Sequence, residues 1–313
     1  MFARLNPQQF QECFLNWIKA INKITSGEVI AIDGKTLRHS YDKGAEQGAI
    51  HMVSAWATEN RLVLGQLKVD KKSNEITAIP ELLKVLELSG CIVTIDTMGC
   101  QKEILKLVSE QDADYIITLK KNQGKLHQNV EQLFKSAIPT DFQGIEHSAY
   151  HTREQSHGRS EIRHYLMLTD VQEHLDPNHK WSKLKSVGLV ESVRTVDGKT
   201  TVETRYYISS LPNNAELFGQ SVRSHWGVEN SLHWGGVSAG EATRPPNLLC
   251  SMLPVNVDEC RIRKDNAPEN FAVMRRLAVN LLGREKSNKR GVKNKQFLAA
   301  MDNEYLSKVL AAA

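Results

Sequence analysis

The sequence GEVIAIDGKTLR at residues 27–38 contains an apolar run that leads directly into an acid. Val29 to Ile32 is apolar throughout, which is typical of a strand buried on both faces. Asp33 is expected to end that strand. The Gly-Lys-Thr that follows is not a phosphate loop, because an apolar strand stands where its glycine-rich part would be.

The flanking sequence predicts partners for this strand. The runs HMVSAWA and LVLGQL are β-rich and are separated by the polar turn TENR, which predicts two antiparallel strands. Together with the first strand they form a meander. The runs lie at residues 51–57 and 62–67, with a helix expected at 75–89.

The pattern of the opening stretch recurs at CIVTID, residues 91–96, which also ends in an aspartate, Asp96. A helix at 102–110 and an apolar strand at 115–119 follow it. Strand, helix and strand in this order imply a parallel unit. The residues therefore predict an α/β protein with a mixed sheet flanked by helices.

Residues 136–212 have a different character and are expected to form a β-rich insertion. Two β-rich runs there are joined by Asp197-Gly198, a strong hairpin signal. Helices are expected on both sides of the insertion and near both ends of the chain, at 7–24, 125–136, 214–234 and 267–283.

Composition excludes several classes of protein. The 313 residues carry a net charge of +4 with a pI near 8.7, a basic excess that permits nucleic-acid binding without requiring it. The five cysteines are scattered without a CxxC pair, which argues against a disulfide framework or a zinc finger. With no apolar run of membrane-spanning length and no leader-like start, we expect a soluble cytoplasmic protein.

Three acids carry the candidate chemistry: Asp33, Asp96 and Glu229, the last on the helix expected at 214–234. Strand ends can bring such acids to one sheet edge. Carboxylate oxygens there can hold two Mg²⁺ or Mn²⁺ ions for phosphoryl transfer. The alternative is that each aspartate only caps a strand or turn.

A zinc site is a further alternative, because His225, Glu229 and His233 share one helical face. The spacing is not HExxH and no further ligand is evident, so metal binding through Glu229 with the two aspartates is favoured.

Basic residues near these acids suggest a track for the phosphate backbone of DNA, although each could be an ordinary solvated charge. The basic segment at 284–295 is an additional candidate for nonspecific contact. The candidate DNA-binding residues are Lys35, Arg38, Lys120, Lys121, Arg159, His225, Arg261 and Arg263.

The motifs, taken in order, resemble those of bacterial insertion-sequence DDE transposases, the family that includes the H-repeat-associated proteins of Rhs elements. The resemblance covers nearly the whole chain. It rests on IAIDGKTLRHS, IDTMGCQKEI, TLKKNQ, RSHWGVENSLHW and DECRIRKDNAPENFAVMRRLAVNLL.

This resemblance implies that Asp33, Asp96 and Glu229 are the catalytic, metal-binding acids on an RNase H-like fold with a β insertion before the last catalytic helix. It implies Mg²⁺-dependent cleavage and transfer of double-stranded DNA at element ends, in a homo-oligomeric complex that joins two ends. The expected segments are a remnant of an N-terminal associated region (1–26), the first part of the core (27–135), the insertion (136–212), the rest of the core (213–283), and a basic tail with a short terminal helix (284–313).

Two departures from the family pattern favour an alternative, a catalytically dead remnant that binds DNA. The chain is expected to start inside the N-terminal region of its relatives. Residues 235–255 resemble an inserted segment, and Pro245-Pro246 within it would break a helix. A third reading is a metal-dependent phosphatase or nuclease acting on small substrates.

Overall fold

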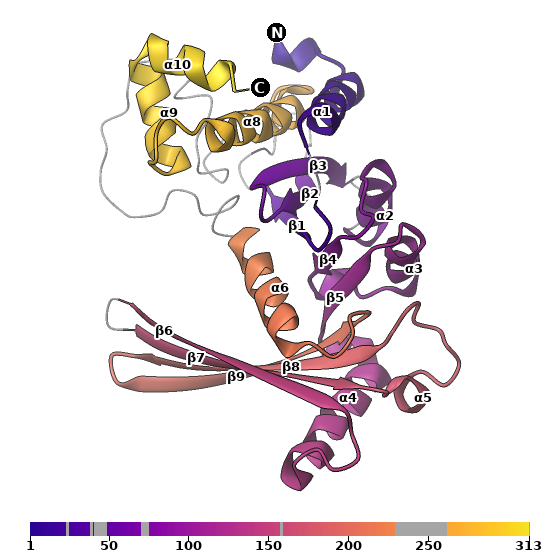
Figure 1. Ribbon diagram of the computed structural model, residues 1–313. Helices are drawn as coiled ribbons and strands as arrows, with labels where there is room; N and C mark the ends of the chain where they lie inside the picture. The colour runs from indigo at the N-terminus through magenta and orange to yellow at the C-terminus, as the bar shows by residue number, and fades with distance from the viewer. Residues whose placement is uncertain are drawn as a thin grey trace. The chain divides into compact units, whose positions relative to one another are not determined.

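The computed structural model describes residues 1–22, 25–37, 40, 49–69, 75–156, 159–228 and 262–312 (Figure 1). The chain forms two compact units. The first comprises Met1–Ile24, Ala31–Leu86 and Trp226–Ala313, and the second comprises Thr25–Ile30 and Glu87–His225. Strand β1 (Val29–Thr36) contributes to both, because its first two residues belong to the second unit.

The strands of the first unit confirm the predicted meander. Their order is β3-β2-β1, with β2 (His51–Ala57) antiparallel to β3 (Leu62–Val69). One expectation was wrong: β1 does not end at Asp33 but continues to Thr36. The continuation is stabilised beyond the strand, where buried Leu37 donates its backbone N–H to Ile50 O at 2.9 Å.

Helices α1 (Pro7–Ile21) and α2 (Glu75–Val85) pack on one face of this meander. Asn6 caps α1, because its Oδ1 accepts from the backbone N–H of Gln8 and Gln9. Gly65 lets both helices approach β3: a Cβ there would lie 3.1 Å from Leu82 and 3.3 Å from Leu15. Helix α2 ends earlier than residue 89, the expected end.

Helix α8 (Ala267–Arg284) packs against β3, an edge strand, and holds it through its polar groups. Asn280 accepts from Val63 N at 2.8 Å and donates to Val63 O at 3.0 Å. These two bonds satisfy backbone groups of the edge strand that would otherwise lack a hydrogen-bond partner.

Two helices, α9 (Val292–Met301) and α10 (Asn303–Leu310), follow α8 where one short helix was expected; η1 (Phe2–Arg4) lies at the other end of the chain. Lys295, part of the predicted basic segment, is 5% exposed and donates to Leu282 O at 3.0 Å. This lysine is therefore a structural residue rather than a free contact for DNA.

The strands of the second unit confirm the predicted parallel unit and hairpin. β4 (Ile92–Ile95) runs parallel to β5 (Asp114–Leu119). Asp197 and Gly198 both have positive φ, 49° and 76°, as a tight hairpin turn requires. The remaining strands are β6 (His147–Ser156), β7 (Arg159–Thr169), β8 (Ser186–Val196) and β9 (Lys199–Ser209).

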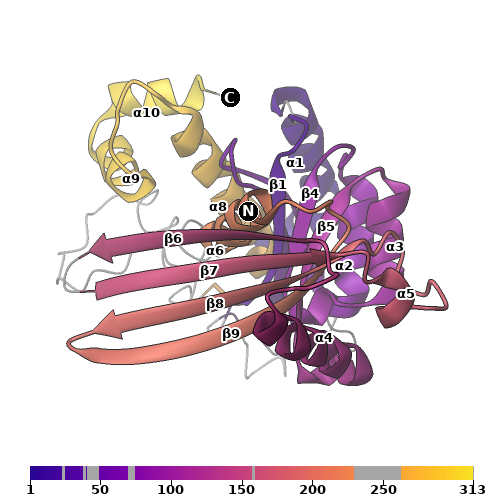
Figure 2. The same cartoon turned by 60° about the horizontal axis from the view of Figure 1, so that its bottom comes forward.

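The order in this unit is β4-β5-β9-β8-β7-β6, so the predicted insertion extends the sheet instead of forming a sheet of its own. The join is made by β9, which pairs antiparallel with β5, Ile117 facing Ile208. Figure 2 shows β6 to β9 side by side.

Helix α6 (Ala215–Val228) packs tightly on these long strands. A Cβ on Gly188 of β8 would lie 2.3 Å from the Phe218 ring, and one on Gly219 would lie 3.0 Å from the Tyr165 ring. Only glycine permits this approach, which fixes how α6 lies on the sheet. The other helices of the unit are α3 (Lys102–Glu110), α4 (Gly124–Ala137), α5 (Gln172–Leu175), η2 (Thr97–Gly99), η3 (Lys121–Gln123) and η4 (Ile138–Thr140).

In the part of the chain that the structure describes, every helix is too short or too polar to cross a bilayer.

Candidate functional site

Asp33 lies in the first unit, half-buried within β1. Its Oδ1 accepts from the backbone N–H of Gly34 at 2.8 Å, which orients the carboxylate along the strand. Lys35, two residues further, is also half-buried. Period-two alternation along a strand therefore places Asp33 and Lys35 on one face of β1.

A polar cluster that sequence reasoning missed surrounds Gly34. His51 Nε2 donates to Glu75 Oε1 at 2.6 Å, and His51 Nδ1 shares a hydrogen bond of 2.7 Å with Thr36 Oγ1. A Cβ on Gly34 would lie 2.1 Å from Glu75 Oε1, so any larger residue would force the Glu75 side chain to shift. The cluster holds the backbone beside Asp33 in place. The sequence feature that could have indicated this cluster is the glycine directly after the acid.

Two consecutive arginines of α8, Arg275 and Arg276, influence each other, and the charge of Asp33 acts on Arg276. Burial and the charge of Arg275 together lower the pKa of Arg276 to about 10, and the charge of Asp33 acts in the opposite direction. Arg276 Nε donates to Gln66 Oε1 of β3 at 3.4 Å, a long bond. Arg275 and Arg276 are each only 5% exposed.

Asp96 lies in the second unit and, as predicted, directly follows a strand, β4. Its Oδ1 accepts from Met98 N at 2.9 Å and caps η2. The capping role expected from turn preferences is thus present, and the residue is half-buried. Metal binding by Asp96 stays a prediction.

His225 of α6 is bonded to the strand that carries Asp96. Its Nδ1 lies 2.9 Å from Thr94 Oγ1, two residues before Asp96 on β4. Burial lowers the pKa of His225 to about 4, so the ring is uncharged at neutral pH. A neutral ring makes no ion pair with a phosphate, and direct DNA contact by His225 stays a prediction.

The other predicted DNA-binding residues have different surroundings. Lys120 and Lys121 are exposed. Arg159 is bonded to Glu161, which also pairs with Arg163 at 2.6 Å. Arg263 is half-buried.

Glu229, Arg38, Arg261 and His233 lie outside the described residues, as does the segment at 235–255. Asp33 and Asp96 belong to different units, and their meeting at one metal site stays a prediction. Within the described ranges, no three His, Cys, Asp or Glu side chains group closely enough to hold a metal ion.

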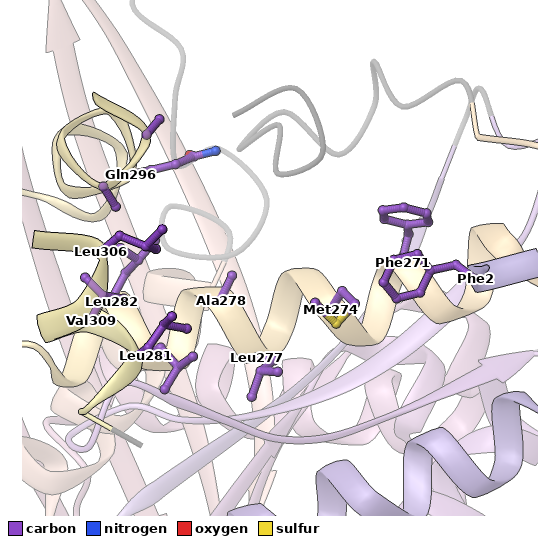
Figure 3. Close-up of a pocket in the computed structure, with 13 residues that line it drawn as sticks. Phe2, Phe271, Met274, Leu277, Ala278, Leu281, Leu282, Gln296, Leu306 and Val309 are labelled. Carbon is purple, nitrogen blue, oxygen red and sulfur yellow. The ribbon is translucent and has the colours of Figure 1, made fainter. Parts of the chain in front are cut away.

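A pocket in the first unit does not serve as the active site. It has a volume of about 140 Å³ and lies between α8, α9, α10 and η1 (Figure 3). Its lining is apolar apart from Gln296, with Phe271, Met274 and Leu281 of α8 among the contributors. Among the described residues it therefore offers no carboxylate for phosphoryl transfer.

Comparison with known proteins gives one consistent family. Residues 24–243 match a family described as "Transposase DDE domain". The chain is 42% identical over 313 residues to the "H repeat-associated putative transposase YhhI" of Escherichia coli (strain K12), covering 99% of this chain and 78% of that protein. The same figures hold for "Putative protein YbfL" of that organism. Among solved structures, the piggyBac transposase synaptic complex with hairpin DNA matches 97% of this chain and 56% of its own, with 12% identity and a TM-score of 0.48.

Proposed function

Because the chain belongs to the Transposase DDE domain family, we propose that it cleaves DNA strands at insertion-sequence ends and transfers them to a target. The observation that carries the proposal is the position of two half-buried aspartates, Asp33 inside β1 and Asp96 directly after β4. The succession of an antiparallel meander and a parallel strand-helix-strand unit supports the RNase H-like core that this chemistry uses.

Asp33 and Asp96, with Glu229 from outside the described residues, would hold two Mg²⁺ or Mn²⁺ ions. The donor set fits hard cations, because both described aspartates offer carboxylate oxygens and neither is deeply buried. When bound, such ions supply Lewis acidity that activates the attacking oxygen and stabilises the leaving one.

The proposed reaction consists of two phosphoryl-transfer steps, cleavage and strand transfer. In cleavage, a water oxygen bonds to phosphorus, the bond from phosphorus to the 3′ oxygen breaks, and that oxygen takes up a proton. In transfer, the oxygen of the freed 3′ hydroxyl loses its proton and bonds to a target phosphorus, the bond from that phosphorus to a second 3′ oxygen breaks, and the displaced oxygen takes up a proton. The chain's own contribution is positioning, because phosphoryl transfer depends on alignment and charge stabilisation.

The proposed partner is double-stranded DNA, both element ends and target, with two copies of the chain bringing two ends together. The backbone would be held by the basic residues predicted from the sequence. Of those basic residues, exposed Lys120 and Lys121 are the most accessible that the structure describes. We propose that the reaction takes place in the cytoplasm.

The test is cleavage of a labelled duplex carrying the element's own ends, with Mg²⁺ or Mn²⁺, by wild type and Asp96→Asn. We expect end-specific nicking by wild type and its loss in the variant. Asp141→Asn is the matched control, because Asp141 is exposed and its positive φ of 50° suits asparagine equally well. Equal inertness of folded wild type and Asp96→Asn would instead favour the catalytically dead remnant.

A further inference from the structure

The turns that follow the parallel strands β4 and β5 lie at the same edge of the sheet, the edge where open α/β sheets bind their ligands. Ile95, the last residue of β4, pairs with Ile117 of β5. Asp96 is one residue past this pair, and Lys120 is three residues past it. Three residues span at most about 11 Å and paired strands lie about 5 Å apart, so Lys120 lies within about 16 Å of the end of β4.

Hydrogen bonds hold the two turns together. Gln123 Nε2 donates to Cys100 O at 2.9 Å, and Gln123 N donates to Lys120 O at 2.9 Å. Cys100 is 1% exposed, and its backbone N–H donates to Thr97 O at 3.2 Å, within the turn that Asp96 caps. All of these residues belong to the second unit. The turn that carries Lys120 is therefore fixed to the turn that carries the acid.

The lysines of the second turn are accessible. Lys120 and Lys121 are exposed, so a DNA backbone can reach both ammonium groups from solvent. The charge of Lys121 is partly balanced: the pKa of Glu131 on α4 is lowered by its hydrogen bond to Lys135 and also by the charge of Lys121. Lys120 forms no ion pair with another described residue. Lys120 therefore carries the less balanced charge of the two.

We propose that Lys120 binds a DNA phosphate that flanks the cleaved one, and that Gln123 is a positioning residue that holds this lysine at a fixed distance from Asp96. The proposal rests on the proposed function and deepens it, because it assigns a contact that sets which bond lies at the acid. A lysine ammonium binds phosphate as a point charge. Phosphates follow each other every 3.4 Å of helix axis along one strand, so the contacted phosphate should lie within about five nucleotides of the cleaved bond.

The first test removes the charge of one phosphate at a time. A duplex carrying the element's own ends is made with single methylphosphonate substitutions, and binding is measured without Mg²⁺ so that no strand is cut. We expect wild type to lose affinity at one phosphate within about five nucleotides of the mapped nick, and Lys120→Met to be insensitive there. The slope of log affinity against log salt should fall by about 0.9 in the variant.

The matched control for this test is Lys106→Met. Lys106 is exposed on α3 and lies 3.7 Å from Glu110, so the substitution removes the same charge from the same unit at a place where a carboxylate already balances it. This variant should keep the sensitivity of wild type at every phosphate.

The second test addresses Gln123. Gln123→Met keeps the length of the side chain and removes the donor to Cys100 O, so Lys120 keeps its charge but loses its fixed position. We expect an unchanged salt slope and a smaller fraction of nicks at the wild-type bond, with nicks appearing at neighbouring bonds. Gln101→Met is the control, because Gln101 is also half-buried and its side chain makes no capping bond at α3. Its nicks should stay at the wild-type bond.

The outcomes separate this inference from the proposed function. If wild type binds and nicks the duplex while Lys120→Met keeps every phosphate sensitivity, the lysine contact is wrong and the proposed function stands. If Gln123→Met lowers the Tm and leaves the nick positions unchanged, Gln123 has a structural role only and its positioning role is wrong. A folded wild type that never nicks the duplex overturns the proposed function and this inference with it.

Discussion

His225 Nδ1 lies 2.9 Å from Thr94 Oγ1, so the last turns of α6 are bonded to β4 two residues before Asp96. The contact joins two segments of the second unit that are far apart in sequence. It positions the end of α6, from which the chain continues toward Glu229. Thr94 and His225 therefore hold the end of α6 against β4.

Replacing Thr94 with valine tests this contact, because valine keeps the shape and removes the hydroxyl. The buried imidazole nitrogen then loses its partner, and we expect the free energy of unfolding to fall by about 1–3 kcal/mol. Denaturant unfolding measures the change. Thr201→Val is the control, because Thr201 is exposed and should change stability by less than about 0.5 kcal/mol. Equal effects of the two substitutions would contradict the assigned role.

Acid should destabilise the protein through His225. Burial lowers its pKa from 6.5 to about 4, so the unfolded chain takes up this proton first as the pH falls. The stability is fully present above pH 6.5 and is lost as the pH falls toward 4, by at most about 3 kcal/mol. Unfolding of wild type and His225→Gln across this range measures it. The free energy of unfolding of the variant should depend less on pH than that of wild type. Parallel curves for the two proteins would mean that another group is responsible.

Gly34→Ala should destabilise the first unit. Its Cβ would lie 2.1 Å from Glu75 Oε1, so the carboxylate must move away from His51, at an expected cost of about 1–3 kcal/mol. Adding Glu75→Ala should recover part of the loss, which a double-mutant cycle measures. Gly291→Ala is the control, because no atom lies within 4 Å of its Cβ position. Strict additivity of the two substitutions would show that the clash is relieved elsewhere.

Arg163→Met should break an ion-pair network that ties α6 to the long strands. Arg163 bonds Glu154 at 3.1 Å and Glu161 at 2.6 Å, and Glu154 also accepts from Arg223 of α6 at 3.0 Å. Glu161 is 8% exposed but keeps its bond to Arg159, so removing Arg163 should cost about 2 kcal/mol in unfolding free energy.

The control for that network is Lys84→Met, which removes an exposed pair with Glu81 and should cost less than about 1 kcal/mol. Both costs are measured by denaturant unfolding at low and moderate salt. A loss at Arg163 as small as at Lys84 would mean that the network does not hold α6.

Local features of the sequence were enough to predict several of the elements and the family. The apolar runs before Asp33 and Asp96 predicted two strands, Asp197-Gly198 predicted a hairpin, and the structure has all three. These features are local: burial sets the hydrophobic period, and a tight turn needs particular residues. The ordered motifs identified the family for the same reason, because they are contiguous in the chain.

Which distant residues meet could not be read from the sequence and depends on the packing of the folded chain. The pairing of β9 with β5, the bond from His225 to Thr94, and the burial of Arg275 join segments that no periodicity relates. An arginine on an amphipathic helix has the same sequence signature whether water or a strand faces it. Side chains such as Arg275 and Gln66 acquire their unmet hydrogen bonds only when packing removes the water.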